Sequence, residues 1–339
     1  MCEIKIEYER ETGHCSVSPY VKEITIKSIE KGINSDNLYV VSFEEMGWNA
    51  VTSLTTYEVG QKVMFIPPES VLPNELGDKL NITKYLSKGR VKVSSFRGNR
   101  SEGIIVNREI VEPYLPHIMK WEDLPTIGMA GEQISPSDVP YDFIRFYKMP
   151  NILNEPNTFK GGDDIWFSEK IHGSNSRCGW MIHPTTGNYE FYVGSHEVVF
   201  KLDDSTNPIY KQVVEKYKDV FPKGVEFFFE VYGRGIQDLH YDCTLPSFRI
   251  FAACTRGYYI SIPKLIDICD DAGLPRVNFW NSTFESLEEI RTIADTPSEY
   301  TTKHMREGIV IVSGEHPEKM AKCLGFKYLD RKGKKTERH

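Results

Sequence analysis

The chain has 339 residues, enough for two domains that each bury a core of their own. No apolar run approaches membrane-spanning length and no basic-then-apolar leader follows Met1, so we expect neither a membrane protein nor a secreted one. The seven cysteines are scattered without a C-x-x-C pair. This pattern argues against a zinc site or a disulfide scaffold and favours reduced thiols in an intracellular protein, cytoplasmic or nuclear.

The formal net charge of −7 argues against a nucleic-acid partner only if the charge is evenly spread. Two tracts are instead strongly basic. The first, which contains no acid, comprises Lys84, Lys88, Arg90, Lys92, Arg97 and Arg100, and the second comprises Lys327, Arg331, Lys332, Lys334, Lys335 and Arg338. Each tract is either a track for phosphates or a solvated surface, and the sequence leaves both readings open.

Residues 1–112 have the pattern of a small all-β domain. Apolar and polar residues alternate between turns marked by Gly and Pro, which predicts strands at 23–27, 37–41, 61–66, 90–94 and 103–106. Five short strands are typical of an OB-type β-barrel, whose face commonly binds single-stranded or nicked nucleic acid. We assign that contact to Lys92, Arg97 and Arg100, and the alternative is a barrel with only a packing role.

Residues 113–142 read as a linker. Five prolines fall between Pro113 and Pro140, with Gly128 and Gly131 among them. Proline removes a backbone donor and glycine adds backbone freedom, so no helix or strand of useful length is expected there.

Residues 143–339 mix strand and helix patterns over long intervals. Strands are predicted at 165–167, 189–193, 225–232, 248–253 and 258–262, with a hairpin turn at 186–188. Helices are predicted at 207–217 and 262–272, the second with Pro263 in its first turn and Gly273 at its end. This order predicts an α+β domain with antiparallel sheets and not a Rossmann series.

Five motifs run in order through this second domain. They are Glu169-Lys170-Ile171-His172-Gly173-Ser174-Asn175, Phe228-Phe229-Glu230-Val231-Tyr232-Gly233, Phe248-Arg249-Ile250-Phe251, Arg306-Glu307-Gly308-Ile309-Val310-Ile311 and Ala321-Lys322-Cys323-Leu324. Over residues 145–332 the series resembles the covalent nucleotidyltransferases, which comprise the ATP-dependent polynucleotide ligases and the mRNA capping enzymes. His172 resembles the nick-sealing branch of the RNA ligases, because DNA ligases and capping enzymes usually carry Asp at that place.

The resemblance implies an N-terminal OB-type barrel followed by an antiparallel-sheet, ATP-grasp-like nucleotidyltransferase domain. Phe96-Arg97-Gly98 and Ser101-Glu102-Gly103 resemble the end of the N-terminal domain in one group of RNA ligases. The implied activity is ATP-dependent joining of 3′-hydroxyl and 5′-phosphate RNA ends through lysyl-AMP, at nicks in duplex RNA during RNA repair. The expected partner is RNA, and we expect a monomer.

The same resemblance assigns roles to residues. It implies catalysis by Lys170, His172 and Lys322; nucleotide binding by Glu169, Gly173, Glu230, Phe251, Lys322 and Lys327; and binding of Mg²⁺ or Mn²⁺ by Glu307 and Glu230. The chemistry is consistent with these residue types. A lysine is nucleophilic only when deprotonated, which burial or a nearby cation favours, and a hard divalent cation needs oxygen ligands.

Three departures from the family pattern leave alternatives open. Ser195 is followed by His196 where the family often has Arg, Phe251 is followed by Ala252 in place of Asp, and Leu324 stands where a second lysine is common. Lys327 is the nearest substitute for that lysine, and Phe248 also fits the place of the stacking aromatic. The alternatives are a DNA ligase or capping-type enzyme, or a nucleic-acid-binding module with weakened catalysis. DNA ligases and capping enzymes carry an OB domain after the last motif, whereas here the β domain comes first, which favours an RNA ligase.

Overall fold

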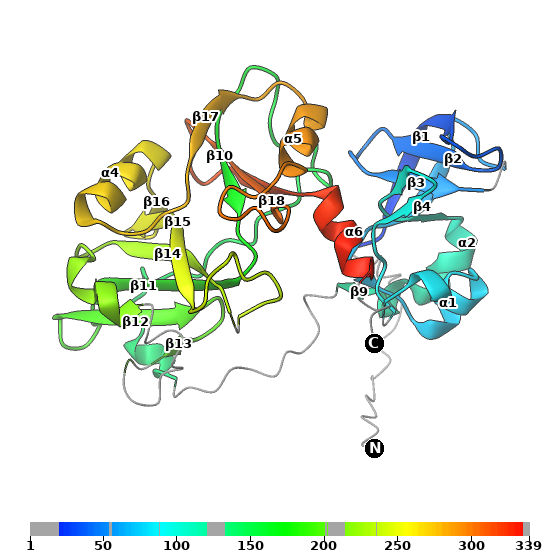
Figure 1. The fold of residues 1–339 in the computed structure, drawn as a ribbon. Helices are drawn as coiled ribbons and strands as arrows, with labels where there is room; N and C mark the ends of the chain where they lie inside the picture. The colour runs from blue at the N-terminus through cyan, green and yellow to red at the C-terminus, as the bar shows by residue number, and fades with distance from the viewer. Residues whose placement is uncertain are drawn as a thin grey trace. The chain divides into compact units, whose positions relative to one another are not determined.

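The computed structural model describes residues 20–53, 56–87, 89–120, 133–200, 202, 214–234 and 236–334 (Figure 1). The chain divides into two compact units. The N-terminal unit comprises Met1–Glu44 and Asn49–Pro125, and the C-terminal unit comprises Glu45–Trp48 and Thr126–His339. The domain boundaries at 112 and 142 stay a prediction. Among the described helices, none is both long and apolar enough to span a bilayer.

The N-terminal unit is built on a five-stranded antiparallel sheet with the order β3-β2-β1-β4-β8. Its strands are β1 (Lys22–Lys31), β2 (Tyr39–Phe43), β3 (Asn49–Thr52), β4 (Lys62–Ile66) and β8 (Ile104–Val106). A bulge between Ile26 and Ser28 bends β1, which pairs with β2 along one part and with β4 along the other. One face of this sheet packs on a core that includes Met64, Ile66 and Leu76.

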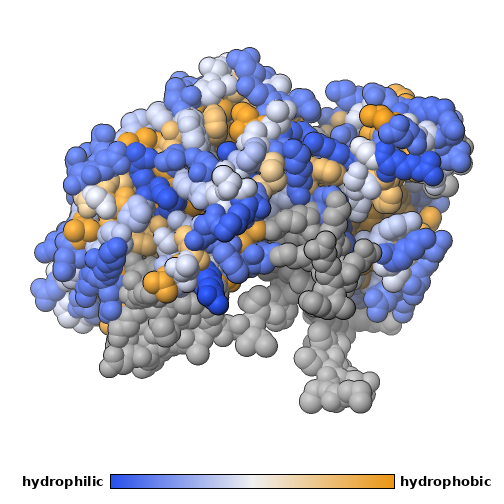
Figure 2. All heavy atoms as spheres, viewed as in Figure 1, coloured by the Kyte–Doolittle hydropathy of each residue, from blue (hydrophilic) through white to orange (hydrophobic). Residues whose placement is uncertain are grey.

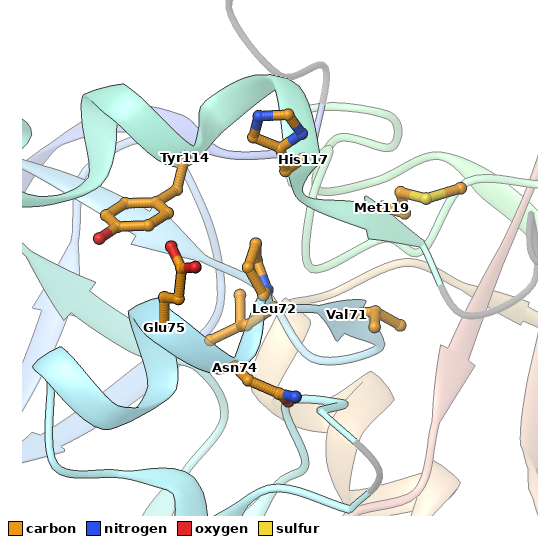
Figure 3. Close-up of a pocket in the computed structure, with 8 residues that line it drawn as sticks. Val71, Leu72, Asn74, Glu75, Tyr114, His117 and Met119 are labelled. Carbon is orange, nitrogen blue, oxygen red and sulfur yellow. The ribbon is translucent and has the colours of Figure 1, made fainter. Parts of the chain in front are cut away.

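Shorter elements complete this unit. They are β5 (Ser70–Val71), α1 (Asn74–Lys79), η1 (Thr83–Tyr85), β6 (Ser94–Phe96), β7 (Asn99–Ser101), α2 (Arg108–Val111), η2 (Glu112–His117) and β9 (Met119–Lys120). A cavity of about 600 Å³ opens among them, between α1, η2 and β9 (Figure 3). It is lined by Val71, Leu72, Pro73, Asn74, Glu75, Tyr114, His117 and Met119, and none of these belongs to the predicted site.

Four of the five strands predicted for this unit are confirmed, and the strand at 90–94 is wrong. Val91 and Val93 are buried, as their alternation indicates. Among the described residues, the backbone of Val91 bonds to that of Glu69 and Ser70, however, and Glu69 has a left-handed φ of 69°, so the extended segment opposite Val91 ends there. The fifth strand of the sheet is instead β3, a segment that the pattern did not single out.

The expectation that residues 113–142 hold no helix of useful length is also wrong for the first residues of that segment. Pro113 lies in the first turn of the 3₁₀ helix η2, where its fixed φ is tolerated. Leu115 and Ile118 are buried in the core of the N-terminal unit. This part of the predicted linker is therefore held by packing. Residues 121–132 lie outside the described part of the chain, and η4 (Pro136–Asp138) follows them.

The C-terminal unit contains two antiparallel sheets. The smaller sheet has the order β17-β10-β18-β19, with β10 (Asp164–Lys170), β17 (Trp280–Thr283), β18 (Gly308–Ser313) and β19 (Met320–Leu324). The larger has the order β13-β12-β11-β14-β15-β16, with β11 (Ser174–Ile182), β12 (Tyr189–Ser195), β13 (Val199–Phe200), β14 (Glu226–Tyr232), β15 (Ser247–Thr255) and β16 (Tyr258–Tyr259). The helical elements are η5 (Glu215–Val220), α4 (Ile262–Ala272), α5 (Leu287–Ala294) and α6 (Phe326–Lys334).

The antiparallel α+β prediction for this unit is confirmed. The strands predicted at 165–167, 189–193, 225–232 and 248–253 are present, as is the helix at 262–272, which Gly273 ends with a φ of 64°. The strand predicted at 258–262 is shorter, because α4 begins at Ile262. Most of the helix predicted at 207–217 lies outside the described residues.

The two sheets of the C-terminal unit meet through one apolar cluster. Phe146, Phe228 and Val312 are buried there, and Trp166 and Phe251 pack against them. Because Trp166 and Val312 come from the smaller sheet and Phe228 and Phe251 from the larger, the cluster joins one face of each. On the face that Figure 2 draws, hydrophilic and hydrophobic residues are interspersed.

Candidate active site

Lys170 is the last residue of β10, where the smaller sheet gives way to the turn into β11. Its half-buried Nζ lies 3.2 Å from Oε1 of Glu307. Lys170 pairs with Gly308 of β18. A Cβ at position 308 would clash with the carbonyl oxygen of Cys323, so glycine is what allows β19 to close against β18 beside the lysine.

Gly173 brings a second carboxylate to this lysine. A Cβ at this position would clash with the carbonyl oxygen of Val231 and press on Cγ of Glu230. Because glycine has no Cβ, the turn between β10 and β11 can lie directly on β14. The Gly173 N–H donates a hydrogen bond to the Glu230 carboxylate. Burial raises the pKa of Glu230 to about 7; the charge of Lys170 opposes this shift and that of Glu307 adds to it.

His172 is buried, and oxygen atoms contact both of its ring nitrogens. Nε2 lies 2.8 Å from Oδ1 of Asp238, and Nδ1 lies 2.9 Å from the hydroxyl of Tyr328 and 3.3 Å from Oε2 of Glu307. The His172 backbone N–H donates to the Tyr241 hydroxyl at 2.7 Å. The ring and the main chain of His172 are therefore both fixed.

Glu307 links the nucleophile candidate to this histidine. One carboxylate oxygen contacts Lys170 and the other contacts His172. Glu307 is buried and immediately precedes β18. Its backbone carbonyl accepts from the Gly325 N–H at 2.9 Å, which ties the residue to the end of β19.

The donor set fits a hard divalent cation. Glu230 and Glu307 supply carboxylate oxygens, and the two groups are close enough for the charge of Glu307 to raise the pKa of Glu230. Such a cation needs only one or two carboxylates because it keeps several waters. Within the described ranges, no group of three or more His, Cys, Asp or Glu side chains forms a metal site. Any cation here would therefore complete its shell with water or phosphate oxygens.

Phe251 is the candidate that the structure favours over Phe248 for stacking on a base. Phe248 is buried and packs against Phe229 in a separate core of the larger sheet. Phe251 is the unpaired residue of a bulge in β15, because Phe228 pairs with Ala252 while Phe229 pairs with Ile250. Such a bulge redirects a side chain, and the ring of Phe251 remains partly exposed between the two sheets.

Lys322 lies on the same face of the smaller sheet as Lys170. Paired residues of antiparallel strands share a face, and Lys322 pairs with Val310, which in turn pairs with Ser168. Ser168 is two residues from Lys170, so it too points to that face. Lys170 and Lys322 therefore point to the same face of the sheet, from the two strands that flank β18.

Two predicted nucleotide-binding residues have other partners. The Glu169 carboxylate accepts from the Ser298 hydroxyl at 2.7 Å and from the Glu299 N–H at 2.8 Å, and burial raises its pKa. Lys327 contacts Asp295 through both its backbone N–H and its Nζ. The structure does not bring either side chain to Lys170, and their nucleotide contacts stay predictions.

The predicted nucleic-acid contacts lie in the N-terminal unit. Arg97 is exposed at the tight turn between β6 and β7, with a φ of 51°. Lys92 and Arg100 are half-buried. Arg90 from the same tract bonds to Glu69 at 3.2 Å and so belongs to the fold of this unit.

Sequence reasoning missed Asp238, Tyr241 and Tyr328, which all contact His172. Asp238 and Tyr241 lie in the loop after β14, and Tyr328 lies on α6. No periodicity or motif distinguishes them, because only the packing of the loop and helix around β10 brings them together.

Two facing sheets thus hold a lysine, a histidine and two glutamates together at one strand end. Residues 163–324 match the family model described as RNA ligase, which spans all five motifs. This part of the chain is therefore similar to the RNA ligases.

Solved structures agree on the fold across both units. Naegleria gruberi RNA ligase with pyrophosphate has a TM-score of 0.74 at 15% identity and covers 92% of this chain and 98% of its own. A variant of that enzyme with ATP and Mn has a TM-score of 0.75 at 16% identity, covering 93% of this chain and 100% of its own. A further variant with AMP and Mn has a TM-score of 0.74 at 16% identity, and the match covers 92% of this chain and 98% of the variant's chain. None of the curated proteins compared with the chain matches it.

Proposed function

We propose that this protein is an RNA ligase that uses ATP to join a 3′-hydroxyl to a 5′-phosphate through a lysyl-AMP intermediate, at nicks in duplex RNA. The observation that carries the proposal is the contact of Lys170 and His172 with the two oxygens of Glu307. This arrangement holds the Lys170 amine at the end of a strand, beside the Glu307 carboxylate, which can accept a proton from it. The ATP and AMP complexes of the Naegleria ligase support the choice of nucleotide.

In the first step, the Lys170 amine attacks the α-phosphorus of ATP and pyrophosphate leaves. The attack requires the neutral amine, and Glu307 at 3.2 Å is placed to receive the proton. Lys322, on the same sheet face, provides positive charge for the α-phosphate. AMP then passes to the RNA 5′-phosphate, and the 3′-hydroxyl displaces it. Each displacement is in line at phosphorus, so catalysis depends on positioning and charge neutralisation.

Mg²⁺ or Mn²⁺ would be held by Glu230 and Glu307, whose oxygens suit a hard cation. When bound, the cation neutralises negative charge on the phosphates. The Naegleria ligase complexes with Mn support this assignment. Phe251 would stack on the adenine, because its ring is the partly exposed aromatic at the bulge of β15.

The nick-sealing assignment predicts which strand must be RNA. A protein distinguishes RNA from DNA through the 2′-hydroxyl and the A-form geometry that it favours. The reacting 3′-hydroxyl must lie in line with the adenylylated phosphate, and a misplacement of about 1 Å there costs on the order of a hundredfold in rate. We therefore expect rapid sealing with ribonucleotides at the 3′-hydroxyl end, whatever the sugars of the 5′-phosphate strand, and about a hundredfold slower sealing with a DNA 3′-hydroxyl end.

The measurement uses four nicked duplexes that differ only in the sugars flanking the break. Labelled ATP in the same reactions reports adduct formation on the protein, which does not depend on the duplex. Equal sealing rates on all four duplexes would reject the RNA requirement and favour a DNA ligase. Labelling by GTP in place of ATP would favour a capping-type enzyme.

For the N-terminal unit, we propose an OB-type barrel that engages the RNA. Replacing Lys92, Arg97 and Arg100 together by Gln should weaken RNA binding without slowing adenylylation. Each lost phosphate contact reduces the slope of log affinity against log salt by about 0.7 to 0.9, so the triple variant should lose about 2 to 3. Binding titrations at several salt concentrations measure this slope.

The matched control removes three exposed positive charges from the main sheet of the same unit, at Lys22, Lys27 and Lys62. Its salt slope should stay close to that of the unchanged protein. Equal losses in both triple variants would mean that only net charge matters, and an unchanged slope in the first variant would remove the assigned contacts.

A further inference from the structure

The His172 ring is held from two directions by groups outside the sequence motifs. Asp238, in the loop after β14, contacts Nε2 at 2.8 Å, and Tyr328 of α6 contacts Nδ1 at 2.9 Å. Asp238 presents an ionised acceptor, which fixes Nε2 as the donor. A hydroxyl can donate or accept, so Tyr328 can satisfy Nδ1 whether or not that nitrogen carries a proton. The ring therefore has one preferred orientation.

That orientation determines the geometry around Lys170. The His172 nitrogen that contacts Tyr328 also lies 3.3 Å from Oε2 of Glu307, and the other oxygen of Glu307 lies 3.2 Å from Lys170. A rotation of the imidazole would remove the contact between His172 and this carboxylate. Tyr328 itself is only 2% exposed and packs edge-on to the His172 ring, so its hydroxyl is a fixed group.

We propose that Asp238 and Tyr328 are positioning residues of the ligase, which hold the His172 ring so that Glu307 keeps its place against Lys170. This role rests on the proposed function, because it concerns the step in which Lys170 accepts AMP. Both residues contact the His172 ring, and His172 contacts Glu307, so each acts on Lys170 through these two side chains. Removal of such an outer hydrogen-bond partner commonly costs 10- to 100-fold in activity at comparable sites.

The test measures the single-turnover rate of protein labelling by α-labelled ATP, at a series of ATP concentrations. Tyr328→Phe and Asp238→Asn should each lower the maximal rate by about 10- to 100-fold. The ATP concentration giving half the maximal rate should change little, because neither group is assigned to the nucleotide. Tyr192→Phe is the matched control: Tyr192 is also 2% exposed, and its hydroxyl donates a single bond to the Asp138 carbonyl, at a place remote from Lys170 in the fold.

Combination with His172→Ala separates positioning from a general structural role. If Tyr328 acts through the histidine, adding Tyr328→Phe to His172→Ala should cause no further loss of rate. If Tyr328 had only a structural role, Tyr328→Phe would instead lower the melting temperature, and the rate losses of the two substitutions would multiply in the double variant. The proposal is overturned by a normal rate in Tyr328→Phe, or by multiplying effects in the double variant. A wild-type protein that never becomes labelled would contradict the proposed function itself, and with it this role.

Discussion

Lys170→Ala and Lys170→Arg should both abolish labelling of the protein by α-labelled ATP, a loss on the order of a thousandfold or more. Alanine removes the amine. Arginine retains a cation that can still pair with Glu307, but its guanidinium stays protonated at any useful pH and cannot attack phosphorus. The arginine variant therefore tests the nucleophile itself while preserving the local charge.

Gel analysis of the labelled protein gives the readout, with Lys264→Ala and Lys264→Arg as controls. Lys264 is exposed on α4, in the same unit, and contacts no residue of the candidate site. Labelling of either Lys170 variant at the normal rate would show that another residue carries AMP. A pre-adenylylated RNA would extend the test, since a variant that lacks only the nucleophile should still seal it.

Glu307→Gln should lower the rate of labelling by about a hundredfold or more, the cost of losing one preorganised charged group. The amide has the shape of the carboxylate but cannot take up the Lys170 proton, and it is a weaker ligand for a cation. It also ends the charged contact between this position and His172. Glu307→Ala should be at least as damaging, because it removes both contacts of the side chain.

The control for this prediction is Glu288→Gln, an exposed glutamate in the first turn of α5. It changes net charge equally and should label at the normal rate. Rates should be measured over a range of Mg²⁺ and Mn²⁺ concentrations. A Glu307→Gln protein that labels normally at all of them would remove Glu307 from both assigned roles, whereas full activity of the unchanged protein in the presence of EDTA would remove only the metal-binding role.

Much of the C-terminal unit could be predicted because its pattern is local. The run 225–232 is apolar enough to identify a buried strand, and Pro263 and Gly273 mark the ends of α4. Lys170, His172 and Glu307 could be predicted as well, because they lie in motifs whose order is preserved. Their mutual contacts confirm that the motifs come together in space.

The rest depended on tertiary contacts that no window of sequence reports. The alternation at 90–94 correctly predicted that Val91 and Val93 are buried. It could not predict that the segment forms no regular strand pairing, which depends on the left-handed backbone of Glu69 in the facing segment. Glu169 stands next to Lys170 in the motif but faces Ser298, because neighbouring residues of a strand point to opposite sides. The partners of His172 come from a loop and a helix far along the chain.

The pairing of β10 has a consequence for the newly synthesised protein. β10 ends at Lys170, but its partners β17 and β18 begin at Trp280 and Gly308, so a growing chain must extend well past the lysine before that strand can join a sheet. Contacts of such wide sequence separation form slowly, because a long loop must close first. A nascent chain on the ribosome therefore carries Lys170 before Glu307 and Tyr328 exist, and the proposed adenylylation site is complete only after translation has passed Tyr328 in α6.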